Sequence, residues 1–370
     1  MLGNRRLVVD EWAEVYDLLQ NYADDSFWQW SDVVFDPDTV YIVGRLTVKN
    51  HWSHIRDLCE QWPRRIVFCN PAEGSETVKL QLRRLRITDL VQNGQMLLLT
   101  SGDLEPGFGH LSTDAYFTNI CEYDENRRAA ESSDRVYTSH KPYDFLFLNG
   151  RLRPHRRYLI HRLTQLALLD RALWTCLQSR TDMPWTSALD LSGMPDQEQI
   201  RLLPEHYEID RARQRLALPL PDRDVKHFLF DNTWGDAIVN ARCYTDTSFT
   251  VVTETIYDYP YSFFTEKIWK PMIMCHPWIA VANAGFYRDL RRRGFRTFDH
   301  LIDESFDAIA DPTQRLERIV SVIKHIVDNG AQSFLAAAQD TCKYNQQHLI
   351  EYNRSERLAL PDNLARYING

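Results

Sequence analysis

The chain has 370 residues, of which 44% are hydrophobic and 25% are charged, and this composition is typical of a globular protein. Its formal net charge of −8 argues against a protein that coats nucleic acid through bulk positive charge. Seven cysteines are scattered without a Cys-x-x-Cys pair, which indicates reduced thiols. No apolar run reaches about 18 residues, and the N-terminal residues do not have the pattern of a signal peptide. We therefore expect a cytoplasmic protein without a membrane segment.

The N-terminal part of the chain alternates between predicted strands and predicted helices. Short apolar runs predict the strands, and apolar side chains that recur every three or four residues predict the helices. In chain order, the predicted elements are a helix over 8–22, a strand over 38–44, a helix over 51–61, a strand over 65–69, a helix over 76–87 and a strand over 95–102. Strands that alternate with helices favour a parallel, doubly wound sheet.

A polar stretch without apolar periodicity follows over 126–141, and we interpret it as a linker between two domains. Beyond it, the predicted elements are strands over 143–150, 172–178, 249–255 and 278–282, and helices over 156–169, 313–328 and 332–350. We therefore expect an α/β fold of two Rossmann-like domains with mostly parallel sheets and a cleft between them. The expected parts are an N-terminal domain over 1–140, a C-terminal domain over 141–345, and a tail over 346–370 that is a candidate to cross back to the first domain.

The residues from 262 to 281 (SFFTEKIWKPMIMCHPWIAV) combine a helix start with a following strand. Thr265 is a predicted N-cap, and Glu266 places a negative charge in the first turn of the helix. The exposed backbone N–H groups and the dipole of such a helix start attract anions. Because Lys267 adds a positive side chain, the pattern predicts a phosphate-binding site.

A second cationic segment joins the strand that begins at 143 to the next helix. It reads NGRLRPHRR over 149–157 and contains Arg151, Arg153 and Arg156. In an open α/β sheet, ligands bind outside the carboxyl ends of the strands, and this loop is expected there. Arginine offers several fixed donors and a permanent charge, which suit a diphosphate. We therefore interpret the three arginines as candidate diphosphate ligands.

The triplet Thr265-Glu266-Lys267, the strand after it and the sequence GFRTF at 294–298 together resemble a family motif. The pattern is similar to the nucleotide-sugar motif of family 10 alpha-1,3-fucosyltransferases and of exostosin-like glycosyltransferases, including viral ones. The resemblance covers roughly 141–325. It implies a two-domain glycosyltransferase of the GT-B type that uses a nucleotide-diphosphate sugar as its donor.

The resemblance also implies roles for single residues. Glu266 is expected to contact the nucleotide ribose, and Lys267 is expected to contact the diphosphate. Arg156 stands where the family has a diphosphate-binding arginine at the start of a helix. Glu254 stands where the family has a Glu-Asn pair and is expected to contact the substrate, although Thr255 replaces the Asn and the gap to the triplet is longer.

An inverting transferase needs a carboxylate that removes the proton of the acceptor hydroxyl, and we expect this base in the first domain. Glu73 lies on a predicted strand-to-helix loop after the strand at 65–69 and is the first candidate. Asp103 and Glu105, after the next predicted strand, are the alternatives.

Two stretches match the Asp-x-Asp pattern of metal-dependent transferases, at 36–38 and at 222–224. The first reads as a turn, and the second lies in a loop rich in proline, so we expect neither a metal ion nor another cofactor. His110 and His276 are isolated in the sequence, and we expect a structural role for both.

The leading hypothesis is an inverting, metal-independent glycosyltransferase that moves a sugar from a nucleotide-diphosphate sugar to a hydroxyl of a glycan or a small molecule. Preorganised cations would stabilise the leaving diphosphate in place of a metal. One alternative is a glycosyltransferase that acts on hydroxymethylated bases of viral DNA. The other is a non-catalytic nucleotide-binding protein on the same scaffold. Because the resemblance includes viral proteins, the host cytoplasm is a further candidate location.

Overall fold

The structure, a computed structural model, describes residues 6–10, 13, 19, 25–28, 36, 38–72, 75–104, 108–178, 181, 188–195, 200–207 and 238–369. These residues form an α/β protein in which all the paired strands of the two sheets are parallel. The chain divides into two compact units. The first comprises Met1–Asn119 and Glu351–Gly370, and the second comprises Ile120–Ile350.

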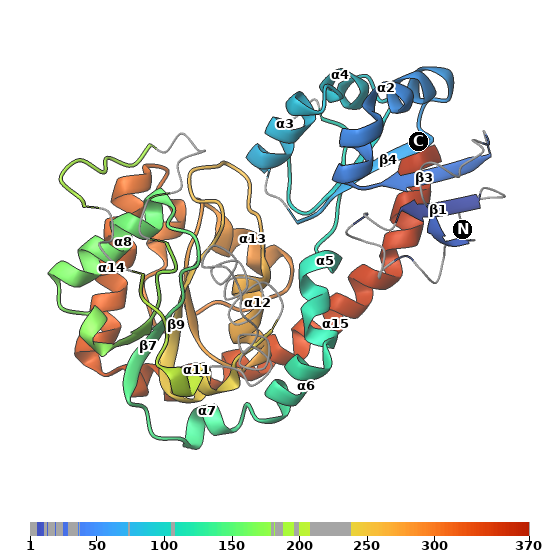
Figure 1. Cartoon of the computed structure of the whole chain (residues 1–370). Helices are drawn as coiled ribbons and strands as arrows, with labels where there is room; N and C mark the ends of the chain where they lie inside the picture. Colours follow the sequence, from blue (N-terminus) through green and yellow to red (C-terminus); the bar gives the residue numbers. More distant parts are fainter. Residues whose placement is uncertain are drawn as a thin grey trace. The chain divides into compact units, whose positions relative to one another are not determined.

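The described part of the first unit contains a six-stranded sheet with the order β2-β1-β3-β4-β5-β6 (Figure 1). Its strands are β1 (Arg6–Asp10), β2 (Asp25–Trp28), β3 (Thr39–Val43), β4 (Ile66–Asn70), β5 (Leu97–Thr100) and β6 (Leu111–Ser112). Its helices are α2 (Arg45–Gln61), α3 (Ser75–Arg84), α4 (Thr88–Gln92) and α5 (Ala115–Thr118). Because the strands are parallel, their carboxyl ends lie at one edge of the sheet.

Both faces of this first sheet are covered, which explains why its central strands consist mainly of apolar residues. On one face, Phe68 and Leu98 belong to a buried cluster with Ile55 of α2 and with side chains of α3 and α4. On the other face, Ile42 belongs to a second cluster with Leu364. Successive side chains of a strand point to opposite faces, so β1, β3, β4 and β5 each supply both clusters.

Helix α15 (Ala331–Asn369) contributes residues to both units, because its residues from Glu351 onward belong to the first unit. Its side chains complete the second cluster of the first sheet. The hydroxyl of Tyr367 accepts a hydrogen bond from the amide of Leu98 at 3.3 Å and donates one to the carbonyl of Gly109 at 2.6 Å. The core of the first unit therefore requires the last residues of the chain.

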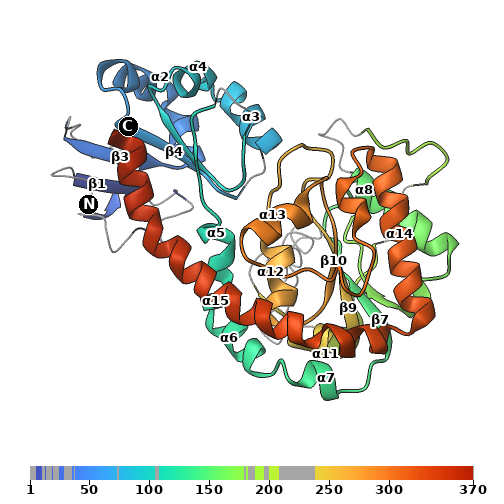
Figure 2. The same ribbon diagram turned by 180° about the vertical axis from the view of Figure 1, so that it is seen from behind.

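The described residues of the second unit contain a four-stranded sheet with the order β10-β9-β7-β8 (Figure 2). Its strands are β7 (Tyr143–Phe147), β8 (Ala172–Trp174), β9 (Thr247–Thr253) and β10 (Trp278–Val281). Its α-helices are α6 (Asp124–Glu131), α7 (Arg135–Thr138), α8 (Pro154–Gln165), α11 (Ala241–Thr245), α12 (Glu266–Ile273), α13 (Phe286–Arg292) and α14 (Pro312–Asn329). The described 3-10 helices are η3 (Asn119–Glu122), η4 (Leu169–Arg171), η5 (Glu205–Tyr207) and η6 (Ser305–Ala308).

Helices cover both faces of the second sheet, with α8 and α14 on one side and α12 on the other (Figures 1 and 2). Aromatic side chains fill much of the core. Phe145 of β7 stacks on Phe249 of β9 with ring centroids 5.4 Å apart, and Phe249 contacts the edge of Phe334 of α15. Trp278 of β10 contacts Tyr287 of α13 at 5.3 Å. Hydrogen bonds from Arg156 of α8 to Thr253 and from Thr265 to Glu254 connect the carboxyl end of β9 to the first turns of α8 and α12.

The predicted helix over 8–22 is wrong at its beginning, because Arg6–Asp10 forms the strand β1. Leu7, Val8 and Val9 are all buried between neighbouring strands and helices. A short apolar run fits a buried strand and a helix equally well, so the periodicity in this part of the sequence was misleading. The other strands predicted for the first domain are confirmed as β3, β4 and β5.

The predicted linker over 126–141 is also wrong, because helices α6 and α7 occupy most of it. Asn126 is fully buried there. Its amide donates to the carbonyl of Ile120 and accepts from the amide of Val239, both at 2.7 Å. A polar sequence can therefore be part of a packed unit when its polar groups are paired. The compact units divide after Asn119, not at 140. Residues 346–369 of the predicted tail are the last part of helix α15, and the residues from Glu351 onward belong to the first unit.

No disulfide joins the seven cysteines, all of which lie in the described part of the chain. All but Cys121 are buried. Among the described residues, no helix is both long enough and apolar enough to cross a membrane.

His276 follows α12 and has the structural role that its isolation in the sequence predicts. The ring is buried, its Nε2–H donates to the carbonyl of Thr247 at 2.9 Å, and its Nδ1 accepts from the hydroxyl of Thr250 at 2.9 Å. Burial lowers the pKa of His276 from 6.5 to about 3. The imidazole is therefore neutral in the folded protein at neutral pH.

We predict that His276 makes the protein sensitive to acid. In the unfolded chain His276 binds a proton near its ordinary pKa of about 6.5, whereas in the folded protein it does so only near pH 3. Stability is therefore lost as the pH falls from about 6.5 towards 3, at up to about 1.4 kcal/mol per pH unit. Urea unfolding between pH 4 and 7 should show that His276→Gln has a shallower pH dependence than the wild type. The exposed His300 provides the control, and an equal slope for wild type, His276→Gln and His300→Gln would contradict the prediction.

Candidate anion-binding site

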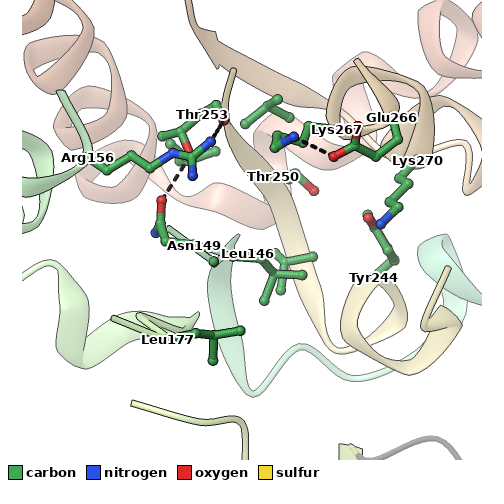
Figure 3. Close-up of a pocket in the computed structure, with 14 residues that line it drawn as sticks. Leu146, Asn149, Arg156, Leu177, Tyr244, Thr250, Thr253, Glu266, Lys267 and Lys270 are labelled. Carbon is green, nitrogen blue, oxygen red and sulfur yellow. Dashed lines mark hydrogen bonds and ion pairs between the residues drawn. The ribbon is translucent and has the colours of Figure 1, made fainter. Parts of the chain in front are cut away.

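A pocket lies at the carboxyl ends of β7 and β9, beside the first turns of α8 and α12 (Figure 3). Its volume is about 90 Å³, which suits a compact polar group better than a whole nucleotide. Leucine and valine side chains form much of the wall. The polar and charged lining consists of Asn149, Arg156, Tyr244, Thr250, Thr253, Glu266, Lys267 and Lys270. This is the edge at which open α/β sheets bind their ligands.

The start of α12 is fixed by Thr265, as the sequence predicts. Its hydroxyl accepts from the amide of Lys267 at 3.4 Å and so caps the helix. The same hydroxyl donates to Oε2 of Glu254 at 2.6 Å, and Oε1 of Glu254 accepts from the amide of Thr265 at 3.3 Å. The two residues therefore hold each other through both backbone and side chain.

Glu254 has no exposed surface and does not line the pocket. Its Oε2 also accepts from the amide of Thr255 at 3.2 Å. Burial raises the pKa of this carboxyl, although Lys267 and the hydrogen bonds of Thr265 act in the opposite direction. The geometry thus makes Glu254 a support for the start of α12.

Lys267 and Glu266 form an ion pair on the first turn of α12. The Lys267 ammonium also donates to the hydroxyls of Thr255 and Thr265, each at 3.3 Å, and 30% of its side chain is exposed. The Glu266 side chain is only 6% exposed. Burial alone would raise the pKa of Glu266, but the positive charges of Lys267 and Lys270 outweigh that effect and lower it.

Arg156 is a buried cation in the first turn of α8, with only 4% of its surface exposed. Its guanidinium donates to the carbonyls of Arg151 at 2.8 Å, Thr253 at 2.9 Å and Glu254 at 3.3 Å. It forms no ion pair with any carboxylate of the described residues, and its Nε has no hydrogen-bond partner among them. Burial and the neighbouring charge of Arg153 lower the pKa of Arg156 to about 9. A negatively charged ligand would offset both the burial of the Arg156 charge and its repulsion by Arg153.

The three arginines of the loop have different positions. Only Arg156 lines the pocket. Arg153 is buried at the residue before α8, and Arg151 is exposed and offers its backbone carbonyl to Arg156. The loop therefore presents one guanidinium to the pocket and uses the backbone of another residue to orient it.

Asn149, which the sequence analysis did not select, lies two residues after the end of β7 and is 1% exposed. Its Oδ1 accepts from the hydroxyl of Thr253 at 2.9 Å. Its Nδ2 has no partner within the described residues. An unpaired buried donor costs about 1–3 kcal/mol. A ligand that presents an acceptor to Asn149 and to Arg156 would remove this cost at both side chains. The signal in the sequence that could have identified Asn149 is its position at the carboxyl end of the predicted strand over 143–150.

The acids that the sequence suggests as bases belong to the first unit. Glu73 and Glu105 lie outside the described residues, whereas Asp103 is described and exposed after β5. The structure also shows a buried carboxylate that the sequence analysis missed. Asp10, at the end of β1, accepts from the amide of Gly44 at 3.1 Å and from the hydroxyl of Thr47, so it supports the start of α2.

The described residues contain no group of three or more His, Cys, Asp or Glu side chains that could hold a metal ion. Of the two Asp-x-Asp stretches, Asp222-Arg223-Asp224 lies outside the described residues. In the other, the amide of Asp38 donates to Oδ1 of Asp36 at 2.8 Å, which is the local bond of an Asx turn.

Comparisons of the chain with protein-family models, with characterised proteins and with solved structures found no match.

We predict that Thr265→Val loosens the start of α12. The substitution keeps the shape of the side chain but removes the cap of the helix and one donor to the buried Glu254. Loss of an N-cap typically destabilises a helix by about 0.5–2 kcal/mol. Hydrogen exchange should show faster exchange for the amides of α12, because local opening becomes easier. Thr265→Ser keeps the hydroxyl and should exchange like the wild type, and equal protection in Thr265→Val would contradict the assigned role.

Proposed function

We propose that the protein is a metal-independent glycosyltransferase that moves a sugar from a nucleotide-diphosphate sugar to an acceptor hydroxyl with inversion. The observation that carries this proposal is the buried guanidinium of Arg156, which has a free Nε and no ion pair with the described carboxylates, in the same pocket as Lys267. A guanidinium in that state favours an anionic ligand, and arginine is well suited to phosphate oxygens.

The charge of the pocket supports a ligand with more than one negative charge. Its described lining contains three cationic side chains, Arg156, Lys267 and Lys270, and one carboxylate, Glu266. The whole chain, in contrast, has a formal net charge of −8. A local excess of positive charge in a negatively charged protein indicates a specific anion site rather than general affinity for polyanions.

The same arrangement suits the chemistry of glycosyl transfer. When the bond between sugar and phosphate breaks, negative charge develops on the leaving diphosphate. Fixed cations beside a helix start stabilise that charge without reorganisation. In this proposal, Arg156 and Lys267 bind the diphosphate and Glu266 contacts the ribose. Glu254 acts through Thr265, because its hydrogen bonds hold the start of α12.

The proposal takes its class of enzyme from the resemblance of the second unit to fucosyltransferase-like and exostosin-like sequences. The same resemblance implies two Rossmann-like domains with a cleft between them. It also implies that the first of these domains carries the catalytic base. Glu73 is the first candidate for this base, and Asp103 and Glu105 are the alternatives. The parallel α/β sheets of both units are consistent with this architecture.

We predict that Lys267→Ala weakens the binding of nucleoside diphosphates by about 1.5–3 kcal/mol, the usual contribution of a charged hydrogen bond. Isothermal titration calorimetry with GDP and UDP measures the effect directly. Lys324→Ala is the matched control, because Lys324 is exposed on α14 and does not line the pocket. Unchanged affinity in a folded Lys267→Ala protein would contradict the phosphate role, and the absence of binding by either nucleotide at millimolar concentration would contradict the proposed donor.

We also predict that transfer does not depend on a divalent ion, because Arg156, Lys267 and the helix dipole already supply positive charge to the leaving diphosphate. The release of nucleoside diphosphate from donor sugars, with glycan and small-molecule acceptors, should continue in excess EDTA. The rate should stay within about twofold of the rate with magnesium, well below the tenfold change that corresponds to about 1.4 kcal/mol. Activity that is lost in EDTA and restored by manganese would assign the protein to a different class of transferase.

A further inference from the structure

Two donors in the pocket have no acceptor in the part of the chain that the structure describes. They are Nε of Arg156 and Nδ2 of Asn149. Both side chains are more than nine-tenths buried, and both line the pocket. Each atom carries hydrogen and can only donate. A ligand that fits these two side chains must therefore present oxygen acceptors.

Thr253, the last residue of β9, orients both donors (Figure 3). Its hydroxyl donates to Oδ1 of Asn149 at 2.9 Å, which turns the amide so that Nδ2 is left for another partner. Its backbone carbonyl accepts from Nη2 of Arg156 at 2.9 Å, which leaves Nε on the remaining edge of the guanidinium. One residue thus sets the direction of two donors that come from different elements.

The charge at this point favours a phosphate group as the acceptor. Arg156 brings a buried positive charge, and Arg153 beside it has the same sign. Lys267 lines the same pocket. A tetrahedral phosphate can present different oxygens to donors from several directions, whereas a carboxylate presents two oxygens in one plane. Two donors without a partner on separate side chains, together with the positive charge of Lys267, therefore fit phosphate better than carboxylate.

We propose that Asn149 and Arg156 together bind one phosphate group of the ligand, and that Thr253 is the positioning residue for both. The identity of the complete ligand, a nucleoside diphosphate, rests on the proposed function. The subsite itself does not, because inorganic pyrophosphate should occupy it without nucleotide, sugar or turnover. The proposal adds Asn149 to the residues that contact the ligand and Thr253 to those that determine its affinity.

The first test is the binding of inorganic pyrophosphate to the full chain, measured by calorimetry in buffer that contains EDTA. Asn149→Asp replaces a donor by a carboxylate in the pocket that Arg156 also lines. We expect its affinity for pyrophosphate to fall at least tenfold, while its melting temperature stays equal to that of the wild type or rises. These opposite effects distinguish a lost ligand contact from a damaged fold. Asn329→Asp makes the same change at an exposed position on α14 and should bind as the wild type does.

The second test separates the hydroxyl of Thr253 from its backbone. Thr253→Val keeps the carbonyl that holds Arg156 but removes the hydroxyl that orients Asn149. We expect a fall in pyrophosphate affinity of about threefold to tenfold, corresponding to the loss of one oriented hydrogen bond. Thr253→Ser should restore the affinity, because it returns the hydroxyl. Equal affinity in Thr253→Val and the wild type would overturn the positioning role.

The outcomes also separate this proposal from the proposed function. If pyrophosphate binds and Asn149→Asp abolishes binding, but no sugar transfer occurs, the subsite stands and the transferase proposal fails. If nucleoside diphosphates bind and transfer occurs, but the Asn149 and Thr253 variants bind pyrophosphate normally, the subsite proposal fails alone. Acetate is the control for ligand class, and binding of acetate as tight as that of pyrophosphate would overturn the assignment to phosphate.

Discussion

Two consecutive residues at the carboxyl end of β9 hold the two helix starts that face the pocket. The carbonyls of Thr253 and Glu254 accept from Arg156, and the carbonyl of Glu254 also accepts from His155 at 3.0 Å. The carboxylate of Glu254 holds the amide and the hydroxyl of Thr265. The first turns of α8 and α12 are therefore fixed to one point of the sheet. Because these bonds are buried, a shift of this strand end would leave several polar groups unpaired, each at a cost of about 1–3 kcal/mol.

At this strand end, the guanidinium of Arg156 and the carboxyl group of Glu254 lie close enough to influence each other but form no ion pair. Burial lowers the pKa of Arg156 and raises the pKa of Glu254, since each charge is removed from water. Burial also lowers the pKa of His155, and the neighbouring Arg156 adds to this effect, so the ring stays neutral. Arg156 bonds to carbonyls and Glu254 bonds to amides and a hydroxyl. The backbone thus orients the charges but does not neutralise them, and a positive group remains directed at the pocket. This is electrostatic preorganisation, which favours an anionic ligand or leaving group.

Local patterns in the sequence predicted the elements around this point, but not the contacts between them. The cap at Thr265 was predictable because capping involves only neighbouring residues. The run of arginines alone does not distinguish Arg156 from Arg151 and Arg153, because that choice depends on which side chain the first turn of α8 directs inward; the family resemblance was the signal that pointed to Arg156. The structural role of Glu254 depends on a partner eleven residues away. Asn149 was missed because the pairing of its side chain depends on Thr253, which is 104 residues further along the chain. Long-range pairing is not encoded in a local pattern.

The two units differ in the segments of the chain that form them, and this difference allows their roles to be tested separately. The second unit is one continuous segment and contains every residue that lines the pocket. The first unit is discontinuous, because its core includes Leu364 near the end of α15 as well as the N-terminal strands. The residues that line the pocket therefore all lie between 146 and 270, whereas the proposed base belongs to a unit whose core combines N-terminal strands with the end of α15. A change near the C-terminus should consequently affect the acceptor side of the proposed reaction more than the binding of the diphosphate, because Leu364 packs against the first sheet and lines no part of the pocket.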